Sequence, residues 1–260
     1  MTTRGRIRVV VVLTLAMALI LVLLPLQIVG LILFPPVARW VPVFFHKCLT
    51  FLFGIRVSTR NKPSTSRPLL IISNHVSWVD IIVLSSVLPL SFVAKAEMIA
   101  WPIFGQLAQL QRTIFVRREE RRRSGEQASE IAERLQEKDV IVLFPEGTTS
   151  DGHELYPFKT ALFEAARFAL VASEEDHALI QPVALSYSRI HGLPIGRQWR
   201  QQVAWPGDVG LGEHFLPFIA IGAVDVTICF GEPILFTPES NRKEVAAEAR
   251  QKIRAMLQEE

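Results

Sequence analysis

Short apolar runs alternate with longer stretches of helical spacing over most of the chain beyond residue 68. The apolar runs predict buried β-strands, and the longer stretches predict α-helices between them. The expected strands are Leu69–Ser73, Ser91–Ala94, Thr113–Val116, Val140–Phe144, Ile180–Ser186 and Val224–Phe230. The expected helices are Trp78–Val87, Trp101–Leu110, Ser124–Lys138, Thr160–Ser173 and Asn241–Glu259. This alternation predicts the α/β fold class, with a mostly parallel sheet flanked by helices.

The N-terminal part of the chain has a different pattern, which predicts a membrane-embedded helical segment. No charged residue occurs from Val9 to Phe34, and this stretch exceeds the roughly 20 apolar residues that cross a bilayer core. It is longer than the apolar region of a signal peptide, about 7–15 residues, and no small-residue cleavage site follows it. We therefore expect a retained segment. It either spans the bilayer or, with a kink at Pro25, forms a hairpin within one leaflet.

A second apolar stretch, Val41 to Ile55, is too short to span a bilayer and is expected to lie as an amphipathic helix in the interface. The polar segment Asn61 to Arg67 then indicates a linker. We place a domain boundary here, between N-terminal membrane-anchoring helices in residues 1–60 and an α/β catalytic domain in residues 61–260. Positive residues flank the apolar segment on both sides, so its orientation is only weakly indicated.

Composition and charge narrow the possible partners. Half of the residues are hydrophobic, the mean hydropathy is +0.30, and the surplus lies at the N-terminus. The net charge of +3 is compatible with an anionic membrane surface but too weak, without a recognisable motif, to indicate nucleic acid. Cys48 and Cys229 are far apart and lack metal-ligand spacing, so no disulfide framework and no metal site are expected. Free thiols favour the cytoplasmic side.

His75 and Asp80 are the leading candidates for catalysis. They lie in the segment Ser73 to Asp80 (SNHVSWVD), directly after a predicted strand. A neutral imidazole can take the proton from a hydroxyl that attacks a thioester. A carboxylate on the other ring nitrogen can fix the tautomer of the imidazole and stabilise its protonated form. The alternative is that His75 caps a helix and Asp80 faces solvent.

A second polar segment, Phe144 to Ser150 (FPEGTTS), follows the predicted strand Val140–Phe144. Gly147 permits unusual backbone angles, and successive amide groups after it can hold an anion. Glu146 can bind a hydroxyl of an acceptor. Because ligands of parallel sheets lie outside the carboxyl ends of the strands, we expect His75 and Glu146 to meet in one cleft. The alternative is an ordinary turn between a strand and a helix.

Basic residues form a third group of candidates. Lys95, Arg112 and Arg118 lie beside predicted strand ends, where they can meet an anionic head group. For the run Arg121 to Arg123, a solvated helix start or a contact with anionic lipid is favoured over catalysis. An acidic acyl carrier could also dock there. The chain has no GxSxG, HExxH, Walker or GxGxxG motif, so the corresponding hydrolase, peptidase, NTPase and dinucleotide chemistries lack their signatures.

Four ordered segments resemble the glycerolipid acyltransferases of the bacterial lysophosphatidate acyltransferase type. They are Asn74–Asp80, Lys95–Gly105 with Ile114–Arg118, Phe144–Thr148 and Pro182–Val183. The resemblance implies a membrane-bound O-acyltransferase that moves a fatty acyl chain from acyl-CoA or acyl-acyl carrier protein to the free hydroxyl of a lysolipid, such as 1-acylglycerol-3-phosphate. It implies no cofactor and no covalent acyl-enzyme. It also implies the bacterial inner membrane, with the catalytic domain on the cytoplasmic side.

The resemblance also assigns roles to residues. It makes His75 the general base and Asp80 the group that orients it. Glu146 and Gly147 match the acceptor-binding segment of the family, and Arg118 matches the arginine that ends the second segment. The complete acceptor-binding set expected for this chain is Lys95, Arg118, Glu146, Gly147, Thr148 and Thr149.

Two departures from the family pattern concern the acceptor. Thr149 stands where an arginine usually follows Glu-Gly-Thr, and Arg117 stands where an aspartate is usual. A guanidinium clamps phosphate through two charge-assisted hydrogen bonds, which threonine cannot do. Either Arg112, Arg117 or Lys159 replaces the missing arginine, or the acceptor carries no phosphate.

The segment Glu146 to Gly152, together with Phe158-Lys159 and Ala204 to Asp208, is similar to the lyso-ornithine-lipid acyltransferase branch. The acceptor of that branch is an amino-acid lipid without phosphate. Lysophosphatidate and lyso-ornithine lipid therefore both remain open as acceptors. The remoter alternatives are a non-catalytic membrane lipid-binding protein and a hydrolase in which His75 activates water.

Overall fold

The computed structural model describes the chain except for residues 117–123, 173–175, 208 and 260. In chain order its elements are α1 (Thr3–Leu33), α2 (Pro35–Phe53), β1 (Ile55–Arg60), β2 (Leu69–Ser73), α3 (Val79–Ser85), β3 (Ser91–Lys95), η1 (Ala96–Ala100), α4 (Phe104–Leu110), β4 (Ile114–Val116), α5 (Ser124–Gln136), β5 (Val140–Leu143), α6 (Thr160–Ala172), β6 (Ala178–Ile190), β7 (Leu193–Pro194), η3 (Arg197–Gln202), α7 (Leu211–Ile221), β8 (Val224–Phe230), β9 (Ile234–Phe236) and α8 (Arg242–Gln258).

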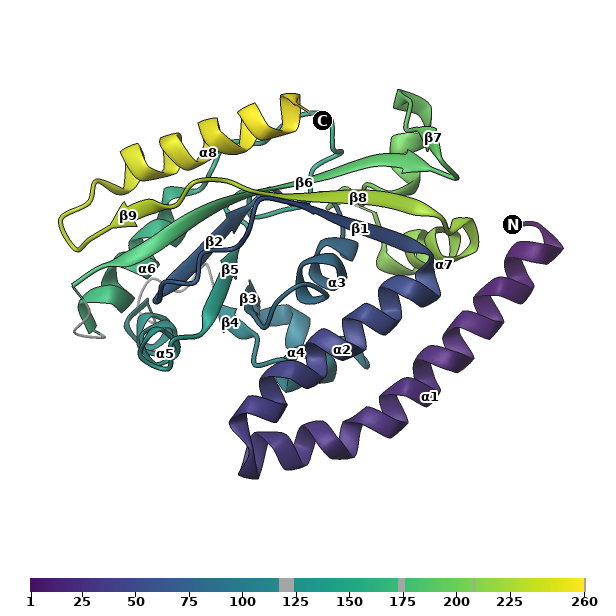
Figure 1. Cartoon of the computed structure of the whole chain (residues 1–260), viewed down its shortest axis with the longest axis horizontal. Coiled ribbons are helices and arrows are strands. Elements are labelled where there is room, and N and C mark those ends of the chain that lie inside the picture. Colours follow the sequence, from purple (N-terminus) through teal and green to yellow (C-terminus); the bar gives the residue numbers. More distant parts are fainter. Residues whose placement is uncertain (117–123, 173–175, 208, 260) are drawn as a thin grey trace.

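The described strands form one sheet in the order β1-β8-β6-β2-β5-β3-β4, with β7 and β9 also paired to β6 (Figure 1). Strands β6, β2, β5, β3 and β4 are parallel to one another. Strands β8 and β1 run in the opposite direction, because β8 pairs with β6 antiparallel and with β1 parallel. The predicted α/β class with a mostly parallel sheet is therefore confirmed.

Helices cover both faces of the sheet, and β2 shows how the core is divided. Its side chains alternate between the faces, as the two-residue period of a strand requires. Leu69 and Ile71 pack on the side of α2, α3 and α7. Leu70 and Ile72 pack on the side of α5, α6 and α8. These four side chains are fully buried, which explains why the strand is a continuous apolar run.

The N-terminal segment forms a helical hairpin in which α1 and α2 lie side by side (Figure 1). The hairpin does not turn at Pro25, as the kink interpretation expected, because α1 continues through Pro25 to Leu33. The turn lies at Phe34, and Pro35 begins α2. Proline suits the first position of a helix because its fixed φ is helical and its missing N–H has no partner there anyway. Helix α2 also begins earlier than the predicted interfacial helix Val41 to Ile55.

Buried Gln27 joins the hairpin internally and ties it to the catalytic part of the chain. Pro42, inside α2, has no N–H to donate to the carbonyl of Ala38. The side-chain Nε2 of Gln27 supplies the missing donor at 3.1 Å, and also donates to the carbonyl of Leu110 in α4 at 2.7 Å. Helices α1 and α2 approach closely at this end of the hairpin, where a Cβ on Gly30 would lie 2.9 Å from the backbone nitrogen of Ala38.

Arg8 ties the other end of α1 to the catalytic part of the chain. Its Nε donates to the carbonyl of Ile219 in α7 at 2.8 Å, and its Nη2 donates to the carbonyl of Leu52 in α2 at 3.2 Å. Both carbonyls belong to the last turn of their helices, where a positive side chain is favoured. The hairpin is therefore held against the catalytic part of the chain at both ends of α1.

The boundary placed at residue 60 stays a prediction, but the residues just before it belong to the sheet. Strand β1 pairs with β8 from Ile55 opposite Val224 to Arg60 opposite Cys229. Polar residues alternate with Ile55 and Val57, so this strand has one buried and one exposed side, as an edge strand does. Strands β7 and β9 and helix α7 were also absent from the predicted elements.

Candidate active site

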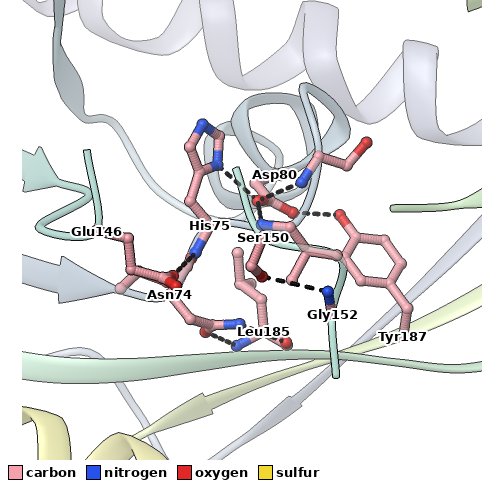
Figure 2. A network of polar contacts seen from close by, with 11 residues as sticks. Asn74, His75, Asp80, Glu146, Ser150, Gly152, Leu185 and Tyr187 are labelled. Carbon is pink, nitrogen blue, oxygen red and sulfur yellow. Dashed lines mark hydrogen bonds and ion pairs between the residues drawn. The ribbon is translucent and has the colours of Figure 1, made fainter. Parts of the chain in front are cut away.

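His75 and Asp80 meet at the carboxyl end of β2, as their spacing predicted. The imidazole Nδ1 of His75 lies 2.8 Å from Oδ2 of Asp80, so the carboxylate accepts the Nδ1 proton when the ring is neutral (Figure 2). His75 follows the last residue of β2 by two positions, and Asp80 lies in the first turn of α3. The turn between these elements brings the two side chains together. This contact contradicts the alternative in which Asp80 faces solvent.

Asp80 is fully buried, and donors hold both of its oxygens. Oδ2 also accepts from the backbone N–H groups of Val76 at 2.7 Å and Ser77 at 3.0 Å. Oδ1 accepts from the hydroxyl of Tyr187 in β6 at 2.6 Å (Figure 2). A buried carboxylate is costly unless such donors replace the water that it has lost, and here both oxygens have donors.

The imidazole of His75 is fixed in orientation and remains reachable. Its ring stacks on Phe144 with centroids 4.0 Å apart and planes inclined by 15°. Phe144 in turn stacks on Phe92 of β3. The His75 side chain keeps 18% exposure, whereas Asp80 keeps none. With Nδ1 directed at Asp80, Nε2 is the nitrogen left to accept a proton from a substrate.

Glu146 lies beside His75, as expected from the strand ends, but its carboxylate is turned toward the backbone. Oε1 accepts from the N–H of His75 at 2.7 Å, and Oε2 accepts from the N–H of Tyr156 at 2.8 Å. The residue is 2% exposed. It therefore joins the His75 loop to the segment that precedes α6. Its predicted role in acceptor binding stays a prediction.

Burial raises the pKa of Glu146 to about 7, and the charge of Asp80 adds to this effect. The two backbone donors and Arg250 act in the opposite direction. Glu146 therefore takes up a proton near neutral pH, next to His75 and Asp80. A titrating carboxyl at this position makes the site sensitive to pH.

The segment after Glu146 is folded inward. Gly147 has a φ of 73°, in the left-handed region that favours glycine. Thr149 and Ser150 are buried, and the Ser150 N–H donates to the carbonyl of His75 at 2.8 Å. Thr148 is half-buried and lies next to Gly207, where a Cβ would come within 2.2 Å of its hydroxyl oxygen. This segment is thus joined to the backbone of His75, and its acceptor-binding role stays a prediction.

The predicted basic residues separate into different places. Lys95 ends β3 and is exposed at the carboxyl edge of the parallel strands, the edge that carries His75. Arg112 lies at the opposite edge, where it pairs with Glu137 and lies 3.2 Å from Asp139. Asp139 immediately precedes β5, so its pairing keeps Arg112 away from the site. The structure therefore separates Arg112 from His75, and a contact of Arg112 with a head group stays a prediction. Arg118 lies outside the described residues, as do Arg117 and the run 121–123.

Several residues of the site were not singled out from the sequence. The amide of Asn74 exchanges two hydrogen bonds with the backbone of Leu185, at 3.0 and 2.8 Å, which joins β2 to β6 (Figure 2). Tyr187, two residues further along β6, reaches Asp80. The backbone N–H of Trp205 donates to the carbonyl of Val76 at 2.8 Å. Tyr187 and Arg200 also line a pocket of about 410 Å³ behind the loop that carries His75.

The described residues carry one helix, α1, that is long and apolar enough to cross a membrane. Large apolar side chains are exposed along the hairpin, among them Val10, Val22 and Ile32 of α1 and Phe51 of α2. Exposed apolar side chains in this number indicate contact with another molecule or with lipid.

Comparisons with known proteins identify the family of this chain. The family model described as Acyltransferase matches residues 54–186. Lyso-ornithine lipid O-acyltransferase of Brucella abortus is 47% identical over 254 residues, which cover 98% of this chain and 95% of that protein. The 1-acyl-sn-glycerol-3-phosphate acyltransferase of Neisseria gonorrhoeae is 41% identical over 113 residues, 44% of each chain.

A solved structure shows the same fold. The crystal structure of the 1-acyl-sn-glycerophosphate (LPA) acyltransferase PlsC from Thermotoga maritima superimposes with a TM-score of 0.62 at 20% identity. The match covers 98% of this chain and 97% of that one. The resemblance stated from the four segments is thereby confirmed. Taken together, the family match and the coverage of the Brucella relative show that this chain belongs to the acyltransferase family.

Proposed function

We propose that the protein is a membrane-associated O-acyltransferase that moves a fatty acyl chain from an acyl thioester to the free hydroxyl of lyso-ornithine lipid. The observation that carries the chemistry is the pair of His75 and Asp80. Asp80 holds Nδ1 of His75, so Nε2 is left as a base on a side chain that is still partly exposed.

The proposed reaction needs one base and no covalent enzyme intermediate. As the hydroxyl oxygen of the acceptor attacks the thioester carbonyl carbon, its proton moves to Nε2 of His75. The resulting imidazolium is stabilised by the buried charge of Asp80. The tetrahedral intermediate then expels the thiolate, and the carbon–sulfur bond breaks. The imidazolium returns its proton to the sulfur, which leaves an ester, a free thiol and neutral His75.

Three observations favour an acceptor without phosphate. Thr149, at the position where the family usually has arginine, is buried and cannot form a bidentate clamp on phosphate. Arg112, considered as its replacement, is paired at the opposite edge of the sheet. The relative that aligns over nearly the whole chain is also named for lyso-ornithine lipid.

Lysophosphatidate is the second candidate acceptor. Lys95 is exposed at the same edge of the sheet as His75 and could meet a phosphate. The Neisseria relative, named for 1-acyl-sn-glycerol 3-phosphate, supports this candidate over less than half of the chain.

The hairpin of α1 and α2 is proposed to lie in one leaflet of the bacterial inner membrane, with the catalytic domain on the cytoplasmic side. Arg8 and Gln27 tie α1 to α7 and α4, respectively. Nineteen residues separate them, a helix length of roughly 28 Å that is held along the protein. A bilayer core is about 30 Å thick, so α1 cannot cross it and keep both contacts. The exposed apolar side chains of the hairpin would then face lipid.

An acceptor screen tests this function. Purified full-length protein in lipid nanodiscs receives labelled acyl-CoA or labelled acyl-acyl carrier protein, together with lyso-ornithine lipid or lysophosphatidate. Mass spectrometry identifies the labelled lipid. We expect ornithine lipid from the wild-type protein, and a loss of at least about 10²-fold in His75→Ala because the general base is gone.

The other outcomes separate the alternatives. Product from lysophosphatidate alone would show that the acceptor is lysophosphatidate and not lyso-ornithine lipid, whereas the proposed acyl transfer would stand. Labelled free acid without dependence on an acceptor would indicate a hydrolase. No thiol release from either donor with either acceptor would indicate a non-catalytic protein. Full activity in a folded His75→Ala variant would refute the mechanism.

A further inference from the structure

Tyr187 is a buried tyrosine whose hydroxyl has a defined partner in the site. It lies in β6, is 8% exposed, and donates to Oδ1 of Asp80 at 2.6 Å (Figure 2). It lies 107 residues from Asp80 in the sequence. Burial, together with the charge of Asp80, raises the pKa of Tyr187 well above its ordinary value of 10.0. The hydroxyl therefore keeps its proton at neutral pH and acts as a donor.

Strand β6 explains how a distant residue reaches Asp80. Alternate residues of a strand point to the same face, so Leu185 and Tyr187 share the face that packs toward α3. Leu185 binds the side chain of Asn74, directly before His75, through its backbone. Tyr187 then meets Asp80, in the first turn of α3. One strand thus fixes both ends of the loop that carries the base.

The two oxygens of Asp80 are held in different ways. Oδ2 accepts from His75 Nδ1 and from two backbone N–H groups. Oδ1 accepts a hydrogen bond from the hydroxyl of Tyr187. Without it, a carboxylate with no exposure would have one oxygen facing neither water nor a donor. Such an oxygen takes up a proton more readily, because the ionised form has lost a stabilising hydrogen bond.

We propose that Tyr187 is a positioning residue, which holds the Asp80 carboxylate through Oδ1 and so keeps Oδ2 aimed at Nδ1 of His75. The inference rests on the proposed role of His75 as the general base. The other ionisable groups around the pair are Glu146, from the segment after β5, and Arg250 of α8, which acts on Glu146. The donor to Oδ1 of Asp80 comes from another element, as Tyr187 lies in β6.

The test is the pH dependence of kcat/KM for Tyr187→Phe in the full-length protein. This variant keeps the aromatic ring and removes the hydroxyl alone. Since the active form needs ionised Asp80 and neutral His75, easier protonation of the pair moves the acid limb of the profile to higher pH. We expect a shift of about one to two pH units, the equivalent of one hydrogen bond to a charged group. On the alkaline plateau we expect a loss of less than about threefold, because the pair is then deprotonated in both proteins.

Two comparisons distinguish positioning from a loss of packing. Thr227→Val removes a hydroxyl from the neighbouring strand, where it contacts Ser58 at 3.2 Å, and should leave the acid limb in place. Replacement of Tyr187 by 3-fluorotyrosine, whose phenol is a stronger donor, should move the acid limb to lower pH. A structural role predicts neither the shift nor its reversal.

An acid limb that does not move in a folded Tyr187→Phe variant would overturn the inference, even if activity falls equally at every pH. The result for His75→Ala separates this outcome from a failure of the proposed function. Full activity in His75→Ala would refute the proposed function of His75 as the general base. An inactive His75→Ala, combined with an unshifted pH profile in Tyr187→Phe, would refute only the role of Tyr187.

Discussion

Replacing Asp80 with asparagine would separate the charge of this carboxylate from its geometry. Oδ2 accepts from three N–H groups, so the asparagine oxygen must occupy that position. The amide nitrogen then takes the position of Oδ1 and faces Tyr187, whose hydroxyl can rotate and accept instead of donating. Asp80→Asn should therefore keep the Nδ1 proton of His75 in place and lose only the negative charge.

The magnitude of the effect follows from the lost charge. Two unit charges about 4 Å apart interact by about 4 kcal/mol at an effective dielectric constant near 20. That energy stabilises the imidazolium of His75 in the transition state, and its loss corresponds to about a 10³-fold lower rate. Asp80→Ala should be more damaging, because four donors would lose their acceptor, at about 1–3 kcal/mol for each that is buried.

The assay is acyl transfer at saturating donor, with thermal unfolding of the same preparations in detergent. We expect Asp80→Asn to lose about 10³-fold in kcat/KM with a nearly unchanged Tm. Asp80→Ala should lose at least as much activity and lower the Tm by roughly 10 °C, as several kcal/mol would in a chain of this size. Wild-type activity in Asp80→Asn would refute the electrostatic argument. An equal loss of Tm in both variants would refute the hydrogen-bond assignment.

Three further changes test other parts of the structure. Because the pKa of Glu146 is raised from 4.5 to about 7, its native state holds a proton that its unfolded state releases, so the free energy of unfolding should fall by about 3 kcal/mol from pH 4.5 to 7. Glu146→Gln should remove this part of the pH dependence in thermal melts, and an unchanged slope would contradict the raised pKa. Gly105→Ala places a Cβ 2.2 Å from the backbone oxygen of Ile99, so we expect a loss of about 1–3 kcal/mol or more in chemical denaturation. A variant as stable as the wild type would show that this turn can relax. Gln27→Leu leaves the carbonyl of Leu110 without the donor from α1 and should increase proteolysis between α1 and α4, whereas wild-type resistance would show that apolar packing alone holds the hairpin.

The local parts of the fold follow from the order of the residues. Strands β2 and β8 have the predicted bounds, Leu69–Ser73 and Val224–Phe230, because each is a short β-rich run whose burial is visible in its own pattern. Strand β6 extends from Ala178 to Ile190, well beyond the predicted Ile180–Ser186. Its carboxyl end, from Ser186 to Ile190, alternates with polar residues, and both ends pair with short strands. The strand character of these ends therefore depends on their neighbours as well as on local hydrophobicity.

Helix α7 was missed for the converse reason, because its local sequence is typical of a loop. It spans Leu211–Ile221, contains Pro217 and is bounded by Gly210 and Gly222. These residues usually punctuate loops. In the structure, burial of Phe218 and Ile219 and the contact from Arg8 hold the segment as a helix. Tertiary packing has overridden local propensity here.

By itself, the sequence determined the apolar N-terminal segment, the alternation of strands and helices, and the pair of His75 and Asp80. Each of these is encoded within a few neighbouring residues. Only the tertiary structure decided which distant groups meet: Tyr187 with Asp80, and Arg112 with Asp139 at the far edge of the sheet. Those contacts depend on strand order and register. Long-range packing sets both, and no local sequence pattern contains them.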